Sequence, residues 1–155
     1  MMKRCNNIYN HPLFRERLAL IEKAETDRIF CLHDLSHALD VARIGYIMIL
    51  ENRFNIDKEL FYAAALLHDA GRYCGIPHNI SGAELAKIVM PECGFSDDET
   101  NLVYNAILGH RNNTNADVFS NILYDADKKS RNCYCCKASR ECYWDTKKRN
   151  NEILI

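Results

Sequence analysis

The sequence has few residues that interrupt helices, with only 3 prolines and 6 glycines among 155 residues. Proline and glycine are the strongest local breaks in regular structure, so their scarcity leaves long uninterrupted segments. Within these segments the apolar residues recur at the three- and four-residue spacing of a helix. The sequence therefore predicts an all-α fold.

The sequence also lacks any apolar run near the roughly 18 residues of a membrane span. Residues 1–18 contain no continuous apolar segment of the kind found in a signal peptide. A net charge of −1, from 20 basic and 21 acidic residues, gives no overall attraction to nucleic acid or to an acidic membrane. We therefore expect a soluble, cytoplasmic protein that has neither a membrane nor a nucleic acid as its partner.

The length and the 48% hydrophobic content suffice for one core and are too small for two. We predict one helical domain over residues 1–132, followed by a Cys-rich appendage over residues 133–155. Apolar spacing and capping residues predict helices over residues 12–26, 34–52, 57–72, 81–91, 96–110 and 118–130. Asp34 and Asp57 are expected N-caps. Ser81 and Ser96, each followed three residues later by glutamate, form capping-box patterns, and Pro91 is expected to end its helix.

Histidines and aspartates stand at the ends of these predicted helices. His68 and Asp69 end the most apolar helix, so both are expected near the centre of the fold, where a carboxylate needs a cation or hydrogen-bond donors. Asp127 follows an apolar stretch in the same way, and His37 comes one turn after His33. Together these side chains form a nitrogen and oxygen set suited to a divalent transition metal. Any one of them alone would more often be a hydrogen-bonded core residue.

The order of these residues resembles the HD-domain superfamily of metal-dependent phosphohydrolases. His37 lies in HALDVAR, His68 and Asp69 in AAALLHDAGR, and Asp127 in LYDADK. The resemblance covers about residues 26–132. It implies an HD-domain helical bundle, a metal held by these four residues, and hydrolysis of a phosphate ester or anhydride by metal-activated water.

Two further histidines, His78 and His110, fall where the two-metal branches of this superfamily carry additional ligands. This similarity implies a second metal, with Asp69 bridging the two ions. The alternative is that both histidines only bind substrate or line the pocket. The expected ions are Fe, Mn, Zn, Co or Ni, with Mg also open.

Cations near the ligands are expected to neutralise the phosphoryl group of the substrate. Arg72 and His33 are the candidates for roles in catalysis beside Asp69, since His33 could hydrogen bond substrate or assist proton transfer. The candidates for substrate binding are Arg43, Arg111, Lys128 and Arg131. Each of these could equally be a surface cation at the C-terminal end of a helix.

The appendage carries four of the eight cysteines within residues 133–142. Cys133 and Cys136 have the C-x2-C spacing of a metal knuckle, with Cys142 as a third ligand and Cys135 as its alternative. A structural zinc ion, before an iron–sulfur cluster, is expected here, and free thiols are the alternative. The fourth ligand could be one of four cysteines outside the appendage or solvent, and these cysteines are Cys5, Cys31, Cys74 and Cys93. The appendage also resembles the Cys-rich, Trp-containing tail of a subgroup of uncharacterised bacterial HD-domain proteins.

The predicted function is hydrolysis of a nucleotide or another small phosphorylated compound by a monomer or homodimer. Two alternatives stay open. The first is a dinuclear-iron oxygenase, a class also found in the HD superfamily. The second is a metal-containing module that binds a ligand and regulates a partner.

Overall fold

The structure is a computed structural model, and it describes residues 1–73, 76–109 and 117–154. Seven α-helices make up this part of the chain, and it contains no strand, so the predicted all-α fold is confirmed. The helices are α1 (Lys3–Asn10), α2 (Pro12–Ala24), α3 (Leu35–Glu51), α4 (Lys58–Leu67), α5 (His78–Glu92), α6 (Asp97–Gly109) and α7 (Val118–Lys129). Two short 3-10 turns, η1 (Cys133–Cys135) and η2 (Thr146–Lys148), lie in residues 131–154, the C-terminal segment.

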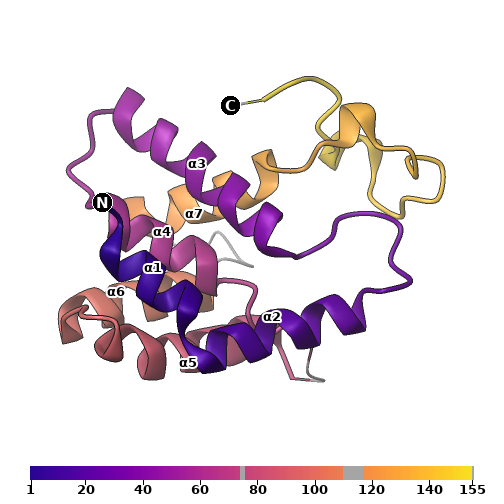
Figure 1. Cartoon of the computed structure of the whole chain (residues 1–155). Coiled ribbons are helices and arrows are strands. Elements are labelled where there is room, and N and C mark those ends of the chain that lie inside the picture. The colour runs from indigo at the N-terminus through magenta and orange to yellow at the C-terminus, as the bar shows by residue number, and fades with distance from the viewer. Residues whose placement is uncertain (74–75, 110–116, 155) are drawn as a thin grey trace.

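Helix α4 forms the centre of the molecule, and α1, α3, α5, α6 and α7 all contact it (Figure 1). From Leu60 to Leu67 every side chain except that of Tyr62 is buried. A helix that is apolar on nearly all sides is stable only when other helices surround it. Helix α3 packs tightly on α4 at Gly45, where an added Cβ would lie 2.2 Å from the ring of Phe61.

The predicted N-terminal caps are present at three helices. Asp34 and Asp57 accept hydrogen bonds from the backbone N–H groups of His37 and Leu60, at 2.9 Å each. The capping box of α6 is also present, because the hydroxyl of Ser96 and the carboxylate of Glu99 bond each other's backbone N–H groups. These contacts satisfy amide groups that the first turn of a helix leaves without partners.

Helix α5 differs from the prediction at both ends. It begins at His78 rather than Ser81 and continues through Pro91 to Glu92. Ser81 is buried in the first turns of the helix, and Gly82 packs so closely on the end of α4 that a Cβ would lie 2.8 Å from the carbonyl oxygen of Leu67. Tertiary packing of α5 against α4 therefore overrides the capping-box pattern, and Pro91 lies inside the helix, which ends one residue later.

One other helix boundary differs from the prediction, and one helix was not predicted at all. The helix predicted over residues 57–72 ends at Leu67, and tighter turns follow it, with Ala70 and Arg72 donating their backbone N–H groups to residues three positions earlier. Helix α1 was not among the helices predicted from the sequence. Arg4 joins this helix to the core by ion pairs with Asp57, Glu59 and Glu99.

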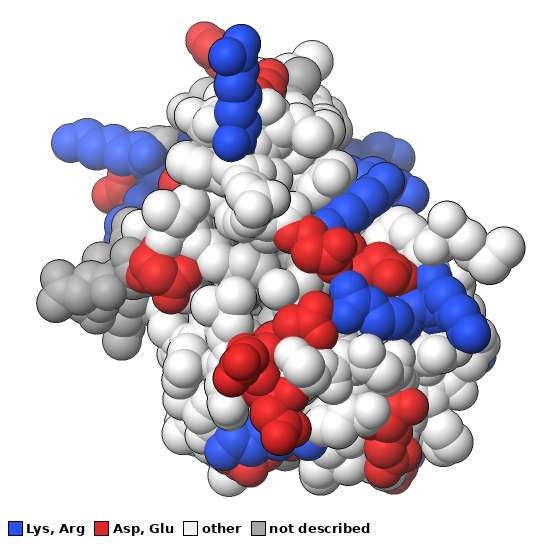
Figure 2. Space-filling model, turned by 90° about the vertical axis from the view of Figure 1, so that its left-hand side faces the viewer, with Lys and Arg blue, Asp and Glu red and all other residues white. Residues whose placement is uncertain are grey.

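The distribution of charged side chains on the surface is consistent with the net charge of −1. On the face shown in Figure 2, acidic and basic side chains are interspersed. Among the described residues, no helix combines the length and the apolar character that crossing a bilayer would require.

Candidate metal centre

His68 and Asp69 follow the last residue of α4, and both belong to the candidate metal centre. His68 is fully buried and Asp69 nearly so. The Nδ1 of His68 lies 2.7 Å from the carbonyl oxygen of Ala65. Because a carbonyl can only accept, Nδ1 carries the proton, and the lone pair of the ring is on Nε2. The Nε2 of His68 lies 3.3 Å from Asp69 Oδ2.

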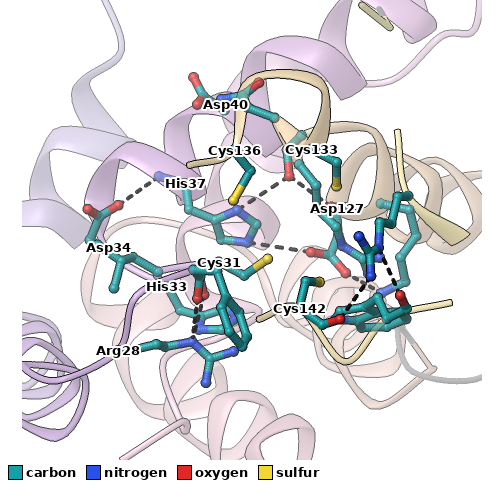
Figure 3. Close-up of a pocket in the computed structure, with 18 of the residues that line it drawn as sticks. Arg28, Cys31, His33, Asp34, His37, Asp40, Asp127, Cys133, Cys136 and Cys142 are labelled. Carbon is teal, nitrogen blue, oxygen red and sulfur yellow. Dashed lines mark hydrogen bonds and ion pairs between the residues drawn. The ribbon is translucent and has the colours of Figure 1, made fainter. Parts of the chain in front are cut away.

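His37 lies in the first turn of α3, where the Asp34 cap sets the start of the helix. Its Nδ1 is 3.3 Å from the hydroxyl of Ser130, and this hydroxyl donates to the carbonyl oxygen of Asp127 at 2.8 Å. The hydroxyl has a single proton, so Ser130 must accept from Nδ1–H of His37. In the neutral ring the lone pair of His37 is therefore also on Nε2, the nitrogen that faces Asp127 (Figure 3).

Asp127 completes the group from the end of α7. Its Oδ1 lies 3.4 Å from the Nε2 of His37 and 4.0 Å from that of His68, and its Oδ2 pairs with the ammonium group of Lys128. Helices α3, α4 and α7 thus bring two imidazoles and two carboxylates to one point. One ligand atom from each of His37, His68, Asp69 and Asp127 lies within 4.8 Å of the other three.

The spacing of these atoms fits a divalent ion. Metal–ligand distances of about 2.0–2.2 Å place neighbouring ligand atoms of one ion about 3.0–3.5 Å apart. The distances from His37 Nε2 to the Oδ2 of Asp69 and the Oδ1 of Asp127 are 3.5 and 3.4 Å, which is longer than a good hydrogen bond. The four residues could therefore hold a metal ion, and their nitrogen and oxygen atoms suit a transition metal.

The electrostatics of the centre favour positive charge. Burial lowers the pKa of His37, but the carboxylates of Asp127 and Asp69 beside it raise that pKa to about 9. Burial raises the pKa of Asp127, but the imidazoles of His37 and His68 and the ammonium of Lys128 hold it well below its usual range. The carboxylate of Asp127 thus stays ionised in a buried site, where a cation offsets its lost hydration.

The other oxygen of Asp69 faces a second group of side chains. Asp69 Oδ1 lies 3.4 Å from the Nε2 of His78, at the first residue of α5, and 2.9 Å from the Nε of Arg72. The two carboxylate oxygens of Asp69 thus face different partners, as a bridging ligand requires. His110, the other predicted ligand for a second ion, lies outside the described residues.

His33 lies beside the centre, held by a residue that the sequence analysis missed. Glu25, which follows α2, lies 2.5 Å from His33 Nδ1 and accepts the backbone N–H of His33 at 2.8 Å. The Nε2 of His33 is 4.0 Å from Asp69 Oδ2. Burial lowers the pKa of His33, so its ring is neutral near pH 7 with Nε2 able to accept a proton.

Glu25 could not be assigned from the sequence, because a glutamate at a helix end has no local signal of its partner. The same holds for Ser130, whose contact with His37 spans 93 positions. Both residues act on the centre through a histidine, as outer partners of metal sites commonly do.

A pocket of about 1020 Å³ opens over the centre. Cations line it, among them the predicted Arg72, Lys128 and Arg131, together with Arg28, Lys148 and Arg149, which the sequence analysis did not name.

Arg43 does not line this pocket; its side chain is 60% exposed and pairs with Asp40. Six positions on a helix rotate a side chain by about 240° beyond a full turn, which turns Arg43 away from the face of His37. Arg111 lies outside the described residues.

The C-terminal segment forms the outer wall of the same pocket. Cys133, Cys136 and Cys142 line it, as does Trp144, over which the guanidinium of Arg131 stacks at 4.2 Å. Figure 3 shows these three cysteines and Cys31 spread around the same pocket as His33, His37 and Asp127.

Comparison with known proteins gives a family match. The model of the family described as HD domain matches residues 34–132, which contain all four residues of the convergent group. An uncharacterized protein of Clostridium beijerinckii is 38% identical over 156 residues, covering 98% of this chain and 99% of its own length. A crystal structure of a predicted HD superfamily hydrolase from an uncultured Thermotogales bacterium is similar, with a TM-score of 0.60 and 30% identity, over 89% of this chain and 82% of the other.

Two larger proteins match over shorter regions. Ribonuclease Y of Acetivibrio thermocellus is 28% identical over 116 residues, which are 75% of this chain and 21% of the relative. A bifunctional uridylyltransferase/uridylyl-removing enzyme of Erythrobacter litoralis is 42% identical over 53 residues, 34% of this chain and 6% of that protein.

Proposed function

This chain belongs to the HD domain family, and on that premise we propose that it is a metal-dependent phosphohydrolase that cleaves a phosphate ester or anhydride of a nucleotide or small phosphorylated compound. The observation that carries the proposal is the convergence of His37, His68, Asp69 and Asp127 within 4.8 Å, beside a pocket that His37, Asp127 and several cations line. The names of two relatives, ribonuclease and uridylyl-removing enzyme, refer to substrates that contain phosphate esters.

These four residues would hold the metal, and His78 with Asp69 Oδ1 would contribute to a second ion. When bound, a divalent ion would lower the pKa of water and offset negative charge on a phosphoryl group. Once the ion displaces the Nε2 proton of His37, both His37 and His68 would present the lone pair of Nε2 without any rearrangement of the rings, because their Nδ1–H groups are already held. Such preorganisation avoids the energy of reorienting the ligands when the ion binds.

Other side chains would bind the substrate and transfer protons. Arg131, stacked on Trp144, and Arg72, paired with Asp69, offer guanidinium groups at the pocket, and such groups bind phosphate oxygens in pairs. His33 would accept a proton at Nε2, since Glu25 holds its Nδ1–H. The resulting imidazolium would be stabilised by the carboxylate of Glu25.

The test begins with protein purified without chelator, whose metal content is measured. A panel of nucleotides and phosphate esters is then assayed for phosphate or nucleotide release with added Mn²⁺, Co²⁺, Ni²⁺ or Mg²⁺. Asp69→Asn is expected to lose both metal and hydrolysis, because the amide keeps the shape and removes the charge.

Arg131→Gln is expected to lower kcat/KM about 10- to 100-fold, the effect of losing a charged hydrogen bond of about 1.5–3 kcal/mol. Arg15→Gln is the matched control, since Arg15 stacks on Tyr9 in the N-terminal region and does not line the pocket. Iron with substrate-dependent oxygen uptake and no hydrolysis would instead indicate an oxygenase. Binding of phosphorylated compounds without turnover under every metal would indicate a regulatory module.

A further inference from the structure

The C-terminal segment has almost no apolar core of its own. Among residues 131–154, Ala138 is the one buried residue. Polar contacts hold the segment in place: Arg149 donates to three carbonyl oxygens at 2.8 Å, and Asn150 donates to three carbonyls at the end of α7. A segment that buries so little apolar surface usually needs a metal or a covalent crosslink to hold one conformation.

The C-terminal segment lies next to the loop between α2 and α3 (Figure 1), and four cysteines are spread around the pocket between them (Figure 3). Cys133, Cys136 and Cys142 come from the segment and Cys31 from the loop, and all four are partly buried and line one pocket. The rings of Phe30 and Tyr143, 5.5 Å apart, hold the loop and the segment together beside these thiols.

The other described cysteines are placed differently. Cys5 and Cys93 are buried in the helical core, where the thiol of Cys5 bonds the carbonyl oxygen of Glu59 at 3.2 Å. Cys135 lines the same pocket but is exposed, and its thiol points to the carbonyl oxygen of Asn132. Cys74 lies outside the described residues, and of the other candidates for a fourth ligand only Cys31 lines the same pocket as Cys133, Cys136 and Cys142.

The backbone has an unusual conformation at two places near these thiols, in the turn after Cys133 and at Cys31. Residues 133–135 form a 3-10 turn, and the backbone N–H of Cys136 bonds the carbonyl oxygen of Cys133 at 3.2 Å, so the two cysteines flank one tight turn. Cys31 has a φ of 51°, a left-handed conformation that costs energy for a residue with a Cβ. The Nε of Arg28 holds the carbonyl oxygen of Cys31 at 3.0 Å in this conformation.

The thiol of Cys31 keeps its proton unless a metal ion displaces it, because its pKa is raised, and cations of the pocket would offset the charge of the thiolates that metal binding creates. Burial raises the pKa of the Cys31 thiol, and Cys133 and Cys142 raise it further, while Arg131 and Arg28 oppose this increase. Four thiolates around a divalent ion carry a net charge of −2, and the guanidinium groups of Arg28, Arg131 and Arg149 lie at the same pocket to offset it.

We propose that Cys31, Cys133, Cys136 and Cys142 bind a structural zinc ion that ties the C-terminal segment to the loop before α3. A four-thiolate set without carboxylates or imidazoles is the preferred set for tetrahedral zinc, with Zn–S distances of about 2.3 Å. Among the described residues, these thiols do not converge within 4.8 Å as the His-Asp group does, so zinc binding would draw the turn of Cys133–Cys136 toward Cys31. The ion would fix the outer wall of the pocket, and its presence does not depend on the hydrolysis proposed above.

Zinc content separates this site from the His-Asp centre. In the variant His68→Ala/Asp69→Ala, which lacks that centre, one zinc ion per chain is expected to remain after purification without chelator. Adding Cys31→Ser or Cys136→Ser to this background should remove the zinc, whereas Cys135→Ser should retain it. A zinc-free His68→Ala/Asp69→Ala protein would overturn the proposal, as would full zinc retention after Cys31→Ser.

A second measurement does not depend on the folding of any variant. Zinc-edge X-ray absorption of the wild-type protein, with Mn²⁺ loaded at the His-Asp centre, should give four sulfur neighbours at about 2.3 Å. Fewer sulfur neighbours, or iron with sulfide in place of zinc, would reject the assignment. A disulfide between Cys31 and a cysteine of the C-terminal segment, found by non-reducing peptide mapping, would reject it too.

Discussion

Replacing Ser130 by alanine removes one hydroxyl that contacts two residues of the metal centre. In the structure this hydroxyl accepts the Nδ1–H of His37 at 3.3 Å and donates to the backbone carbonyl of Asp127 at 2.8 Å. Without it, the imidazole of His37 loses its outer acceptor, and Nε2 is no longer fixed as the atom with the lone pair. Ser130→Ala is therefore expected to weaken metal binding although Ser130 would not touch the ion.

The size of the effect follows from the geometry. Loss of an outer partner of a metal-binding histidine typically lowers affinity about 10- to 100-fold. The contact to His37 is at the long end of the hydrogen-bond range, so a decrease near tenfold, about 1.4 kcal/mol, is expected. In metal-free protein, the buried groups left without partners should lower the free energy of unfolding by about 1–3 kcal/mol. For a domain of this size that corresponds to a decrease in Tm of about 2–12 °C.

The assay is calorimetric titration of metal-free protein with Mn²⁺, together with thermal unfolding of the same samples. Ser120→Ala is the matched control. Ser120 is a buried serine of α7, the helix that ends just before Ser130, and its hydroxyl bonds Asp117 at 2.9 Å, remote from the metal centre. This control should lower Tm and leave the Mn²⁺ affinity within about twofold of wild type. Equal Mn²⁺ affinities for Ser130→Ala and Ser120→Ala would refute the role of the Ser130 hydroxyl in orienting His37.

Three other perturbations have defined outcomes. Glu25→Gln removes the carboxylate that holds His33, so kcat should fall about 10- to 100-fold with metal content unchanged; a loss of metal would mean that His33 is itself a ligand. Burial raises the pKa of Glu99, but hydrogen bonds from a guanidinium of α1 and from the backbone hold it below the ordinary value of 4.5. A lowered pKa in the folded state stabilises the protein above pH 4.5 and ceases to do so as pH falls below it, so Glu99→Gln should reduce the free energy of urea unfolding at pH 7 and change it little at pH 3. An equal reduction at both pH values would contradict this assignment. Gly45→Ala places a Cβ against a phenylalanine ring of α4 and should destabilise the fold by about 1–3 kcal/mol, whereas Gly109→Ala, in open space, should stay within about 1 kcal/mol; similar denaturation midpoints for the two variants would show that the α3–α4 contact adapts freely.

The sequence was most informative where local chemistry determines the outcome. Aspartate and serine at Asp34, Asp57 and Ser96 predicted helix starts correctly, because a cap involves residues only three positions apart. It was misleading at Ser81, where the same local pattern is buried against α4 and the helix begins earlier. A capping pattern cannot reveal whether another helix will cover it.

The prediction for Arg43 also failed because it depended on the direction in which a side chain points almost two helical turns after His37. His37 and Arg43 share α3, but the rotation between them places His37 in the centre and Arg43 in solvent. Contacts across long separations were not predictable from local patterns, as Glu25 with His33 and Ser130 with His37 illustrate.

By itself, the sequence determined the helical class and the order of the nitrogen and oxygen donors, because helix periodicity and side-chain chemistry are local properties. The tertiary structure alone decided how those donors are used. Packing of α3, α4 and α7 brings atoms from positions 37, 68, 69 and 127 within 4.8 Å, and the carbonyl of Ala65 and the hydroxyl of Ser130 decide which imidazole nitrogen faces the centre. It likewise placed Cys31 beside the C-terminal cysteines, since that proximity depends on how two distant segments pack and not on any spacing along the chain.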